Sequence, residues 1–405
     1  MDLLVSPVPQ LHTMNPSLGE GALGTMHDAA LGFADEKLVY VGPAADAPSA
    51  KKTVDGSGCV GLPGLVDCHT HSLFAGSRAD EFRRRLAGES YTSILEAGGG
   101  ILSTVSATRL ADDDLLAGLL GQRLDSFLRS GVTTVEVKSG YGLSVAQEIR
   151  LCRILAEGDW PVTVWPTFLG AHAIPKEFRS NREAYVTAVV EEMIPALSGI
   201  ARAVDVYCDR GAFSLDETRR ILKAGMAMGM DGRVHAEQVE HTGVAAMAAQ
   251  MGCLSADHLE QLDDVGIQAM ADSDCVAVLL PGAQLYLNDP APPARALAEA
   301  GVPLAVATDF NPGSSPVREL LSCATLACLR MGLTVEEALL GITKNAALAL
   351  GCRDRGWLGD GSVADFALFE LPPGENESSA LVQYLGGHKT RCVVRNGRLV
   401  WSSEG

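Results

Sequence analysis

Short runs of apolar residues recur along the middle of the chain, and longer amphipathic segments separate them. Within each run the apolar residues are nearly continuous, which is typical of parallel strands buried on both faces. We therefore predict eight parallel strands. The runs lie at residues 62–67, 132–140, 162–170, 203–209, 232–238, 254–260, 275–283 and 303–310.

The segments between the runs have the spacing of amphipathic helices. Residues 214–229 begin with a capping box formed by Ser214 and Glu217, and residues 334–351 repeat the device. A strand followed by a helix or helical hairpin is the unit of an α/β fold. Eight such units predict a (β/α)8 TIM-like barrel.

The two ends of the chain contain short strand-like segments instead. These segments lie at residues 37–42, 364–370 and 390–401. An Asn-Gly pair in the last of them favours a hairpin turn. We expect strands from both termini to pair in one small β-domain, made of residues 1–60 and 353–405, beside a barrel of residues 61–352.

The overall composition limits the classes of partner. Apolar residues make up 47% of the chain and charged residues 20%, which is an ordinary balance for a globular protein. The formal net charge is −18, so we expect neither nucleic acid nor a membrane surface as a partner. A small anionic substrate would need local positive charge from a metal or an arginine.

Cysteine usage and the N-terminal region favour a cytoplasmic location. The ten cysteines are scattered, mostly within apolar segments, and no two form a CxxC pair, which favours reduced thiols over a disulfide framework. No Lys or Arg precedes Lys37, so the positive region of a secretory signal is missing. No apolar run approaches the roughly 20 residues needed to cross a bilayer.

Side chains that can bind metals stand at the ends of the predicted strands, where barrel enzymes place their chemistry. Five of the nine histidines fall on this one predicted face, together with an aspartate. These residues are His69, His71, His172, His235, His258 and Asp309.

The spacing of His69 and His71 predicts a metal site. Two residues apart on a strand, both imidazoles project from the same face and can reach one cation. His235 and Asp309 would add a third nitrogen and a carboxylate from other parts of the barrel. Three nitrogens and one oxygen suit both zinc and iron, and the residue types alone do not choose between them.

The sequence favours one metal ion over two. Barrels that hold two metals in this way commonly use a bridging lysine on the fourth strand, and residues 203–209 contain none. Lys138 follows the second strand, so we interpret it as a structural residue or one that orders a loop. We therefore expect one ion, either Zn²⁺ or iron as Fe²⁺ or Fe³⁺.

Several longer phrases resemble a known protein family. The stretch PGLVDCHTH, with a later histidine and aspartate at strand ends, looks like the amidohydrolase superfamily of metal-dependent hydrolases. The phrases VEVKSGYGL, PTFLGAHAIP and ATDFNPGSSP, and the segment from His69 to Arg109, resemble the imidazolonepropionase family of histidine degradation. The resemblance extends over residues 60–350 and includes long, specific phrases.

This resemblance implies hydrolysis of 4-imidazolone-5-propanoate to N-formimidoyl-L-glutamate by a metal-activated water. It implies that Asp309 accepts and returns the proton and that His258 polarises the carbonyl or stabilises the oxyanion. Arg78 would bind the propanoate carboxylate, whereas the nearby Arg83 to Arg85 would be solvated. The other implied substrate-binding residues are Tyr91, Tyr141, His172, Gln238, Asn311, Gly313 and Ser314.

Further expectations follow from single positions and from the family. Some relatives carry Glu at the position of Gln238, which would allow a second acid–base group there. A glutamine amide can only form hydrogen bonds, so we expect Gln238 to bind substrate and Asp309 to transfer the proton. The adjacent Glu237 should point to the other side if the strand continues. Residues 98–109 lack the GK[ST] ending of a phosphate-binding loop, and we expect them to form a loop over the barrel mouth. Because relatives are usually dimers, a homodimer is expected.

Two other functions share parts of this pattern. A cytosine- or guanine-type deaminase would use the same metal ligands but attack an amidine carbon and release ammonia. Arg78 and the phrase KSGYGL favour an acidic imidazolone over a neutral base. A non-catalytic barrel that binds a ligand or partner is the second alternative, and the complete set of metal-binding residues disfavours it.

Overall fold

The computed structural model describes residues 1–89, 93 and 99–404, and its strands form two separate sheets. One sheet has eight parallel strands that follow one another in chain order, as the sequence predicted. They are β6 (Leu65–Asp67), β7 (Val132–Lys138), β8 (Thr163–Ala171), β9 (Ala203–Cys208), β10 (Asp231–Ala236), β11 (Ser255–His258), β12 (Val276–Leu279) and β13 (Leu304–Val306).

The first and last barrel strands meet just beyond their carboxyl ends. A parallel bridge joins Thr70 to Phe310. Around it the backbone N–H of Asp309 donates to the His69 carbonyl at 2.9 Å, and the N–H of His71 donates to the Phe310 carbonyl at 2.9 Å. The seam of the barrel is therefore closed by the segments that carry His69, His71 and Asp309.

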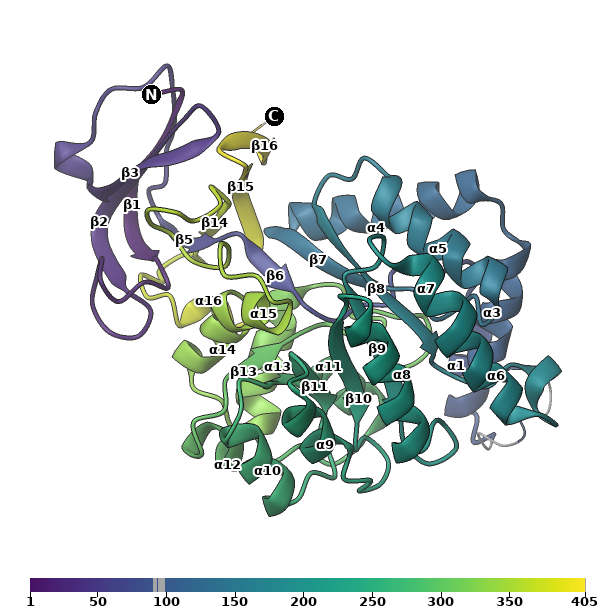
Figure 1. Cartoon of the computed structure of the whole chain (residues 1–405). Helices are drawn as coiled ribbons and strands as arrows, with labels where there is room; N and C mark the ends of the chain where they lie inside the picture. The colour runs from purple at the N-terminus through teal and green to yellow at the C-terminus, as the bar shows by residue number, and fades with distance from the viewer. Residues whose placement is uncertain (90–92, 94–98, 405) are drawn as a thin grey trace.

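The barrel strands are apolar because helices cover them from outside and side chains fill the inside. Every residue of β7, β11, β12 and β13 is buried. The helices surround the barrel in Figure 1. They are α1 (Ala79–Leu86), α3 (Ile101–Leu110), α4 (Asp113–Arg129), α5 (Val145–Glu157), α6 (Arg182–Ala188), α7 (Ile194–Leu197), α8 (Leu215–Ala227), α9 (Val244–Met251), α10 (Asp264–Ala271), α11 (Pro281–Leu287), α12 (Ala294–Glu299), α13 (Leu320–Met331), α14 (Val335–Gly341), α15 (Lys344–Ala349) and α16 (Ala380–Gln383).

Both predicted capping boxes are present, but one predicted helix is interrupted. Ser214 caps α8 and Thr334 caps α14 as expected. Residues 334–351, predicted as one helix, instead form α14 and α15, with a break at Thr343. At the break the Ile342 carbonyl accepts a hydrogen bond from Val66 N–H at 2.9 Å. A bond to the first barrel strand thus replaces a bond within the helix.

The predicted loop at residues 98–109 is wrong for its larger part, because Ile101 begins helix α3. The Glu81 carboxylate accepts hydrogen bonds from the Gly100 N–H at 3.0 Å and from the Ser103 hydroxyl at 3.2 Å. Free N–H groups at a helix start are usually capped by a residue of the same segment. Here the cap comes from another helix, which local sequence does not reveal.

The second sheet is built from both ends of the chain, which lie together beside the barrel in Figure 1. Strand β5 pairs with β1 on one side and with β14 on the other, so it joins N-terminal strands to C-terminal ones. Its strands are β1 (Leu3–His12), β2 (Thr25–Ala34), β3 (Lys37–Pro43), β4 (Lys52–Val54), β5 (Cys59–Pro63), β14 (Phe366–Glu370), β15 (Lys389–Arg395) and β16 (Arg398–Ser402).

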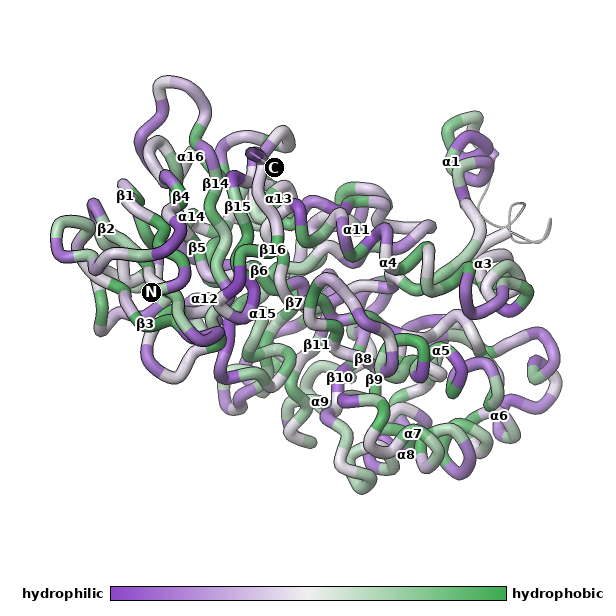
Figure 2. Tube along the Cα trace, turned by 90° about the horizontal axis from the view of Figure 1, so that it is seen from above, coloured by the Kyte–Doolittle hydropathy of each residue, from purple (hydrophilic) through white to green (hydrophobic). Residues whose placement is uncertain are grey.

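The expected hairpin joins β15 to β16. Asn396 and Gly397 both have positive φ, 48° and 69°, as a two-residue turn with right-handed twist requires. Figure 2 shows hydrophobic segments along β6, β14 and β15, where the two sheets meet. At this junction the Gly64 N–H donates to the Asp365 carbonyl at 2.9 Å. The domain limits of 1–60, 61–352 and 353–405 stay a prediction.

All ten cysteines are free thiols, and nine of them are buried. Cys328 is the one that is partly exposed. Among the residues that the structure describes, no helix combines the length and the apolar character needed to cross a membrane.

Candidate metal centre

Four side chains from three parts of the barrel converge at its carboxyl end. The Nε2 atoms of His71 and His235 lie 3.4 Å apart. An Asp309 carboxylate oxygen, Oδ1, lies 3.5 Å from His69 Nε2 and 3.4 Å from His71 Nε2. All four residues are buried. The three histidines form a group whose ligand atoms lie within 4.8 Å of one another.

These separations match the ligand shell of one metal ion. Nitrogen and oxygen ligands about 2.0–2.2 Å from a tetrahedral zinc ion are roughly 3.3–3.6 Å from one another. His69 Nε2 is buried and has no hydrogen-bond partner, which is costly for a polar atom unless something else binds it. Three nitrogens and a carboxylate oxygen are also a suitable donor set, so the residues fit a zinc or iron ion.

Two of the three imidazoles are oriented by buried carboxylates. His69 Nδ1 lies 2.6 Å from Asp257 Oδ2, and His235 Nδ1 lies 3.0 Å from Asp205 Oδ1. A proton held on each Nδ1 leaves Nε2 with a free lone pair toward the centre. Burial lowers the pKa of His235 to about 3, although Asp205 opposes this, so its imidazole is neutral, as metal binding requires.

His71 is held in a different way. Its Nδ1 is buried without a hydrogen-bond partner, and its ring stacks on His172 at a centroid distance of 5.0 Å. His172 Nδ1 lies 3.0 Å from the Gly140 carbonyl. Tyr141 lies beside both rings, with centroids 6.1 Å from His71 and 5.6 Å from His172. The predicted substrate residues Tyr141 and His172 therefore border the metal centre.

Unusual backbone conformations direct two of the site residues. Asp309 has φ 50° and His258 has φ 81°, in the left-handed region that non-glycine residues seldom adopt. Both stand where a strand ends, and the turn brings each side chain into the centre. The His258 ring lies 5.9 Å from His69 and 5.6 Å from His235, measured between centroids.

Behind His258 lies a carboxylate that the sequence analysis did not single out. Glu260 Oε1 is 3.7 Å from His258 Nδ1, and both side chains are buried. Burial disfavours the imidazolium, but the carboxylates of Glu260, Asp309 and Asp257 together outweigh burial and raise the pKa of His258 to about 9. For Asp309, contacts with His69 and His71 outweigh burial and hold the pKa of the carboxyl well below its usual range.

Arg78 lies beside the turn that follows Asp309. Its guanidinium binds Glu81 through Nε and Nη2, both 2.8 Å from Oε2. Its Nη1 approaches Gly313 so closely that a Cβ on Gly313 would come within 2.2 Å of it. Arg78 can therefore occupy this place only if residue 313 is glycine. Arg78 and Gly313, which were both predicted to bind substrate, lie together.

The remaining predicted positions take the following places. The Asn311 amide Oδ1 accepts from the N–H groups of Gly313 and Ser314 at 2.8 and 2.7 Å, so it shapes the turn after Asp309. Gln238 Oε1 accepts a hydrogen bond from the Tyr207 hydroxyl at 3.1 Å. Tyr91 lies outside the described residues.

Glu237 follows β10, which ends at Ala236, so the condition for Glu237 to point to the other side, a strand that continues, is not met. Its carboxylate binds His241 Nδ1 at 3.1 Å and the N–H of Ala245 at 3.3 Å, near the start of α9.

Lys138 is the last residue of strand β7 and is not part of a loop. It is fully buried in the barrel, where it binds Glu136 and Asp205. Sequence reasoning missed Asp205 and Asp257, although a charged residue inside an apolar strand was a usable signal.

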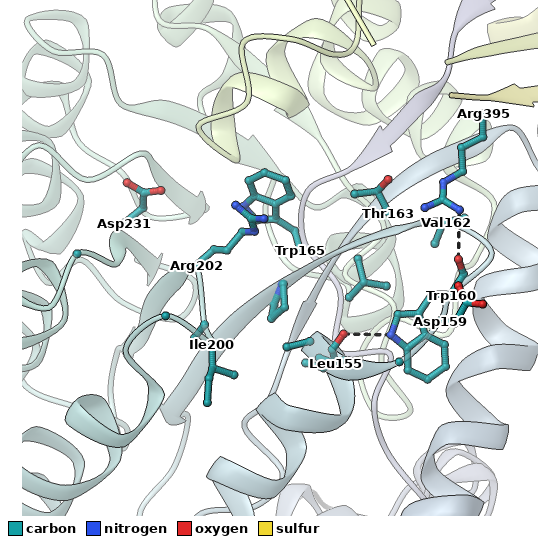
Figure 3. A pocket seen from close by; sticks show the side chains of 17 residues that line it. Leu155, Asp159, Trp160, Val162, Thr163, Trp165, Ile200, Arg202, Asp231 and Arg395 are labelled. Carbon is teal, nitrogen blue, oxygen red and sulfur yellow. Dashed lines mark hydrogen bonds between the residues drawn. The ribbon is translucent and has the colours of Figure 1, made fainter. Parts of the chain in front are cut away.

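A separate cavity of about 650 Å³ lies at the other end of the same strands (Figure 3). Residues that precede or begin β8, β9 and β10 line it, among them Trp165, Arg202 and Asp231. The Arg202 guanidinium lies over the Trp165 ring at 4.1 Å from its centroid. The predicted site residues follow the carboxyl ends of these strands, so this cavity is distinct from the metal centre.

Comparison with known proteins places the chain among hydrolases. Residues 81–401 match the model of the Amidohydrolase family. An imidazolonepropionase from Polaromonas sp. is 46% identical over 390 residues, which cover 94% of this chain and 91% of that protein. An imidazolonepropionase from Shewanella putrefaciens is 43% identical over 400 residues, covering 96% of this chain and 97% of that protein.

Solved structures with little sequence similarity share the fold. An adenosine deaminase from Xanthomonas campestris with bound zinc is 20% identical, with a TM-score of 0.73, over 98% of this chain and 92% of that chain. An atrazine chlorohydrolase from Arthrobacter aurescens, in complex with zinc, is 18% identical, with a TM-score of 0.68, over 99% and 96% of the two chains.

Proposed function

The chain belongs to the Amidohydrolase family and, within it, to the imidazolonepropionases, and from this membership we propose that its histidine cluster is the active site of a ring-opening hydrolase. The enzyme hydrolyses 4-imidazolone-5-propanoate to N-formimidoyl-L-glutamate, a step of histidine degradation. The reaction breaks the cyclic amide C–N bond and adds the elements of water across it. The substrate is a small anion.

We assign one metal ion to His69, His71, His235 and Asp309. The 3.4–3.5 Å spacing of their ligand atoms supports this assignment. When bound, such an ion lowers the pKa of water toward neutrality and polarises carbonyl oxygens. Lys138 binds two carboxylates, Glu136 and Asp205, which supports one ion over a lysine-bridged pair. Zn²⁺ and iron both suit the donor set.

Proton transfer falls to Asp309 and charge stabilisation to His258. Asp309 is ionised at neutral pH, so its carboxylate can accept the proton of the attacking water and return it to the leaving ring nitrogen. The carboxylates around His258 outweigh the effect of burial and raise its pKa to about 9, which favours the imidazolium at neutral pH. Its imidazolium can therefore donate a hydrogen bond to the oxygen that becomes negative when the amide carbon is attacked.

The propanoate arm is assigned to Arg78 and the adjacent turn. Arg78 Nη1 lies against Gly313, and only Nε and Nη2 are engaged by Glu81. A carboxylate at this place would meet the guanidinium and the turn of residues 311–314 together. We assign contacts with the ring and its polar groups to Tyr91, Tyr141, His172, Gln238, Asn311 and Ser314.

The observation that carries this proposal is the convergence of four buried ligand atoms at the carboxyl end of the barrel. A spectrophotometric assay of imidazolonepropanoate hydrolysis, with metal quantification on the same preparation, tests it. We expect turnover that depends on about one equivalent of zinc or iron. Release of ammonia from cytosine or guanine without imidazolonepropanoate turnover would identify a deaminase instead. A protein that retains no metal after supplementation would refute the site.

We further propose that the enzyme acts as a homodimer in the cytoplasm. Ten free thiols are typical of a protein in a reducing compartment. Light scattering of the purified protein checks the dimer: a mass near twice the 42.5 kDa of one chain is expected, and a mass near 42.5 kDa contradicts it.

A further inference from the structure

Lys138 is the buried charge for which the proposed mechanism has no use. We propose that Lys138 is a positioning residue of the metal centre: it links Asp205 and Asp257, the carboxylates that orient His235 and His69, and so keeps both Nε2 atoms directed at one ion. The inference rests on the proposed function only in taking His69 and His235 as metal ligands.

Lys138 is the last residue of β7, and its side chain is 0% exposed. Its Nζ donates to Asp205 Oδ2 at 2.7 Å and to Glu136 Oε1 at 2.8 Å, and it lies 3.9 Å from Asp257 Oδ2. Lysine is almost never fully buried unless it is paired. Burial opposes the ammonium, but Asp205 and Glu136 outweigh burial and raise the pKa of Lys138, so the group stays charged.

Asp205 and Asp257 each bind both a cationic side chain and an imidazole. Asp205 accepts from Lys138 on Oδ2 and pairs with His235 Nδ1 through Oδ1. Asp257 pairs with His69 Nδ1 through Oδ2, which also accepts from Arg233 at 3.3 Å. The Ser255 hydroxyl binds the remaining Asp257 oxygen at 2.6 Å. Rotation of either carboxylate would therefore move a metal-binding imidazole.

A third connection leads from Lys138 to the segment between His69 and His71. Glu136, its other partner, accepts a hydrogen bond from the Thr70 N–H at 3.1 Å through Oε2. The backbone N–H of Lys138 donates to the Thr70 carbonyl at 3.0 Å. Strand β7 thus holds the His-Thr-His segment by its central residue, while the Lys138 ammonium bonds Asp205 behind His235 and forms a longer ion pair with Asp257 behind His69.

Stability alone is a poor explanation for this arrangement. Burying five ionisable groups, here Glu136, Lys138, Asp205, Arg233 and Asp257, costs desolvation energy that apolar residues of similar volume would avoid. Partners that orient metal-binding histidines from behind, by contrast, commonly change metal affinity when they are altered. The position of Lys138 between both carboxylates therefore favours a role in shaping the metal centre.

The test measures metal binding by the full-length protein without substrate. Lys138→Gln keeps a donor for Asp205 but removes the charge. The double variant Lys138→Met/Glu136→Gln removes one cation and one anion, so it should fold even if the single variant does not. Affinity for Zn²⁺ is measured by competition with a chromophoric chelator, and the absorption spectrum of the Co²⁺-loaded protein reports ligand geometry.

We expect the dissociation constant for Zn²⁺ to rise about 10- to 100-fold in the double variant, with an altered Co²⁺ spectrum and a native circular dichroism spectrum. The control Lys344→Met replaces another lysine by methionine, one that binds the Met14 carbonyl. It should leave the Zn²⁺ affinity and the Co²⁺ spectrum unchanged. Folded variants with wild-type affinity and spectrum would overturn the inference, as would an equal loss in Lys344→Met. Wild-type protein that binds no metal would instead defeat the proposed function.

Discussion

Charged residues stand at both ends of the barrel strands, but their surroundings differ. Lys138, the last residue of β7, binds Asp205 in the middle of β9, and both side chains are fully buried. At the amino end, Arg202 and Asp231 are exposed, and Arg202 lies over an indole ring in the cavity of Figure 3. The barrel thus carries compensated buried charges in its interior and solvated charges at the amino end of its strands.

This difference in burial shows why substitutions of charged residues should have unequal effects. Inside the barrel a charge that loses its partner stays desolvated, so each substitution changes the residues it contacts. At an exposed position water replaces a lost partner, and a single ion pair or ring contact contributes little. We therefore expect the effects of substitution to fall steadily from the metal centre to the opposite end.

The largest effect is expected for Asp309→Asn. An amide is a poorer metal ligand and cannot accept the proton, so kcat should fall at least about 1,000-fold. The fold should persist because the backbone bond from residue 309 to the His69 carbonyl is unchanged. Steady-state kinetics with a thermal melt check this. A variant within tenfold of wild-type kcat would remove Asp309 from catalysis.

A smaller effect, confined to substrate binding, is expected for Arg78→Ala. Loss of a charge-assisted contact to the propanoate should raise KM about 10- to 100-fold with a modest change in kcat. Arg83→Ala is the matched control, because Arg83 is exposed and pairs with Asp80 on the same helix. An unaffected KM for Arg78→Ala, or an equal rise for Arg83→Ala, would contradict the assignment.

A shift in pH dependence is expected for Glu260→Gln. In the wild type the Glu260 carboxylate, with Asp309 and Asp257, raises the pKa of His258 to about 9, so activity that needs the imidazolium should decline as pH rises through about 9. Without the carboxylate the pKa of His258 falls, and the alkaline limb of kcat/KM should move to lower pH. A profile from pH 6 to 10 measures the limb. An unmoved limb would mean that another group controls it.

The smallest effect is expected for Arg202→Ala. The exposed cation–π contact with Trp165 should contribute roughly 0.5–1 kcal/mol to the free energy of unfolding, and kcat/KM should not change. Denaturant unfolding and steady-state kinetics give both values. A tenfold loss of kcat/KM would break the contrast between the two ends of the barrel.

Much of the fold could be predicted because it depends on local signals. The barrel strands are mostly apolar and are followed by polar residues, so their order and their carboxyl ends could be predicted from the sequence. The spacing of His69 and His71 likewise depends only on the two-residue period of a strand. His235 and Asp309 then join them because all parallel strands of a barrel present their carboxyl ends at one face.

What could not be predicted depends on contacts between distant segments. The break at Thr343 follows from a bond between Val66 and Ile342, and α3 begins where Glu81 caps it. The partners of Lys138 depend on which residues of β7, β9 and β11 share a level inside the barrel. Sequence shows that charged residues occur in these strands, but not which of them meet.

The closure of the barrel at Thr70 and Phe310 also bears on how the protein is made. His69 leaves the ribosome early and Asp309 late, so a nascent chain that stops short of the eighth strand has histidines but no carboxylate to complete the set. Strand β5 likewise cannot pair with β14 until the C-terminal part of the chain has been made. The complete set of proposed ligands thus forms only when translation is nearly finished, and truncated chains should compete poorly for the cell's metal supply.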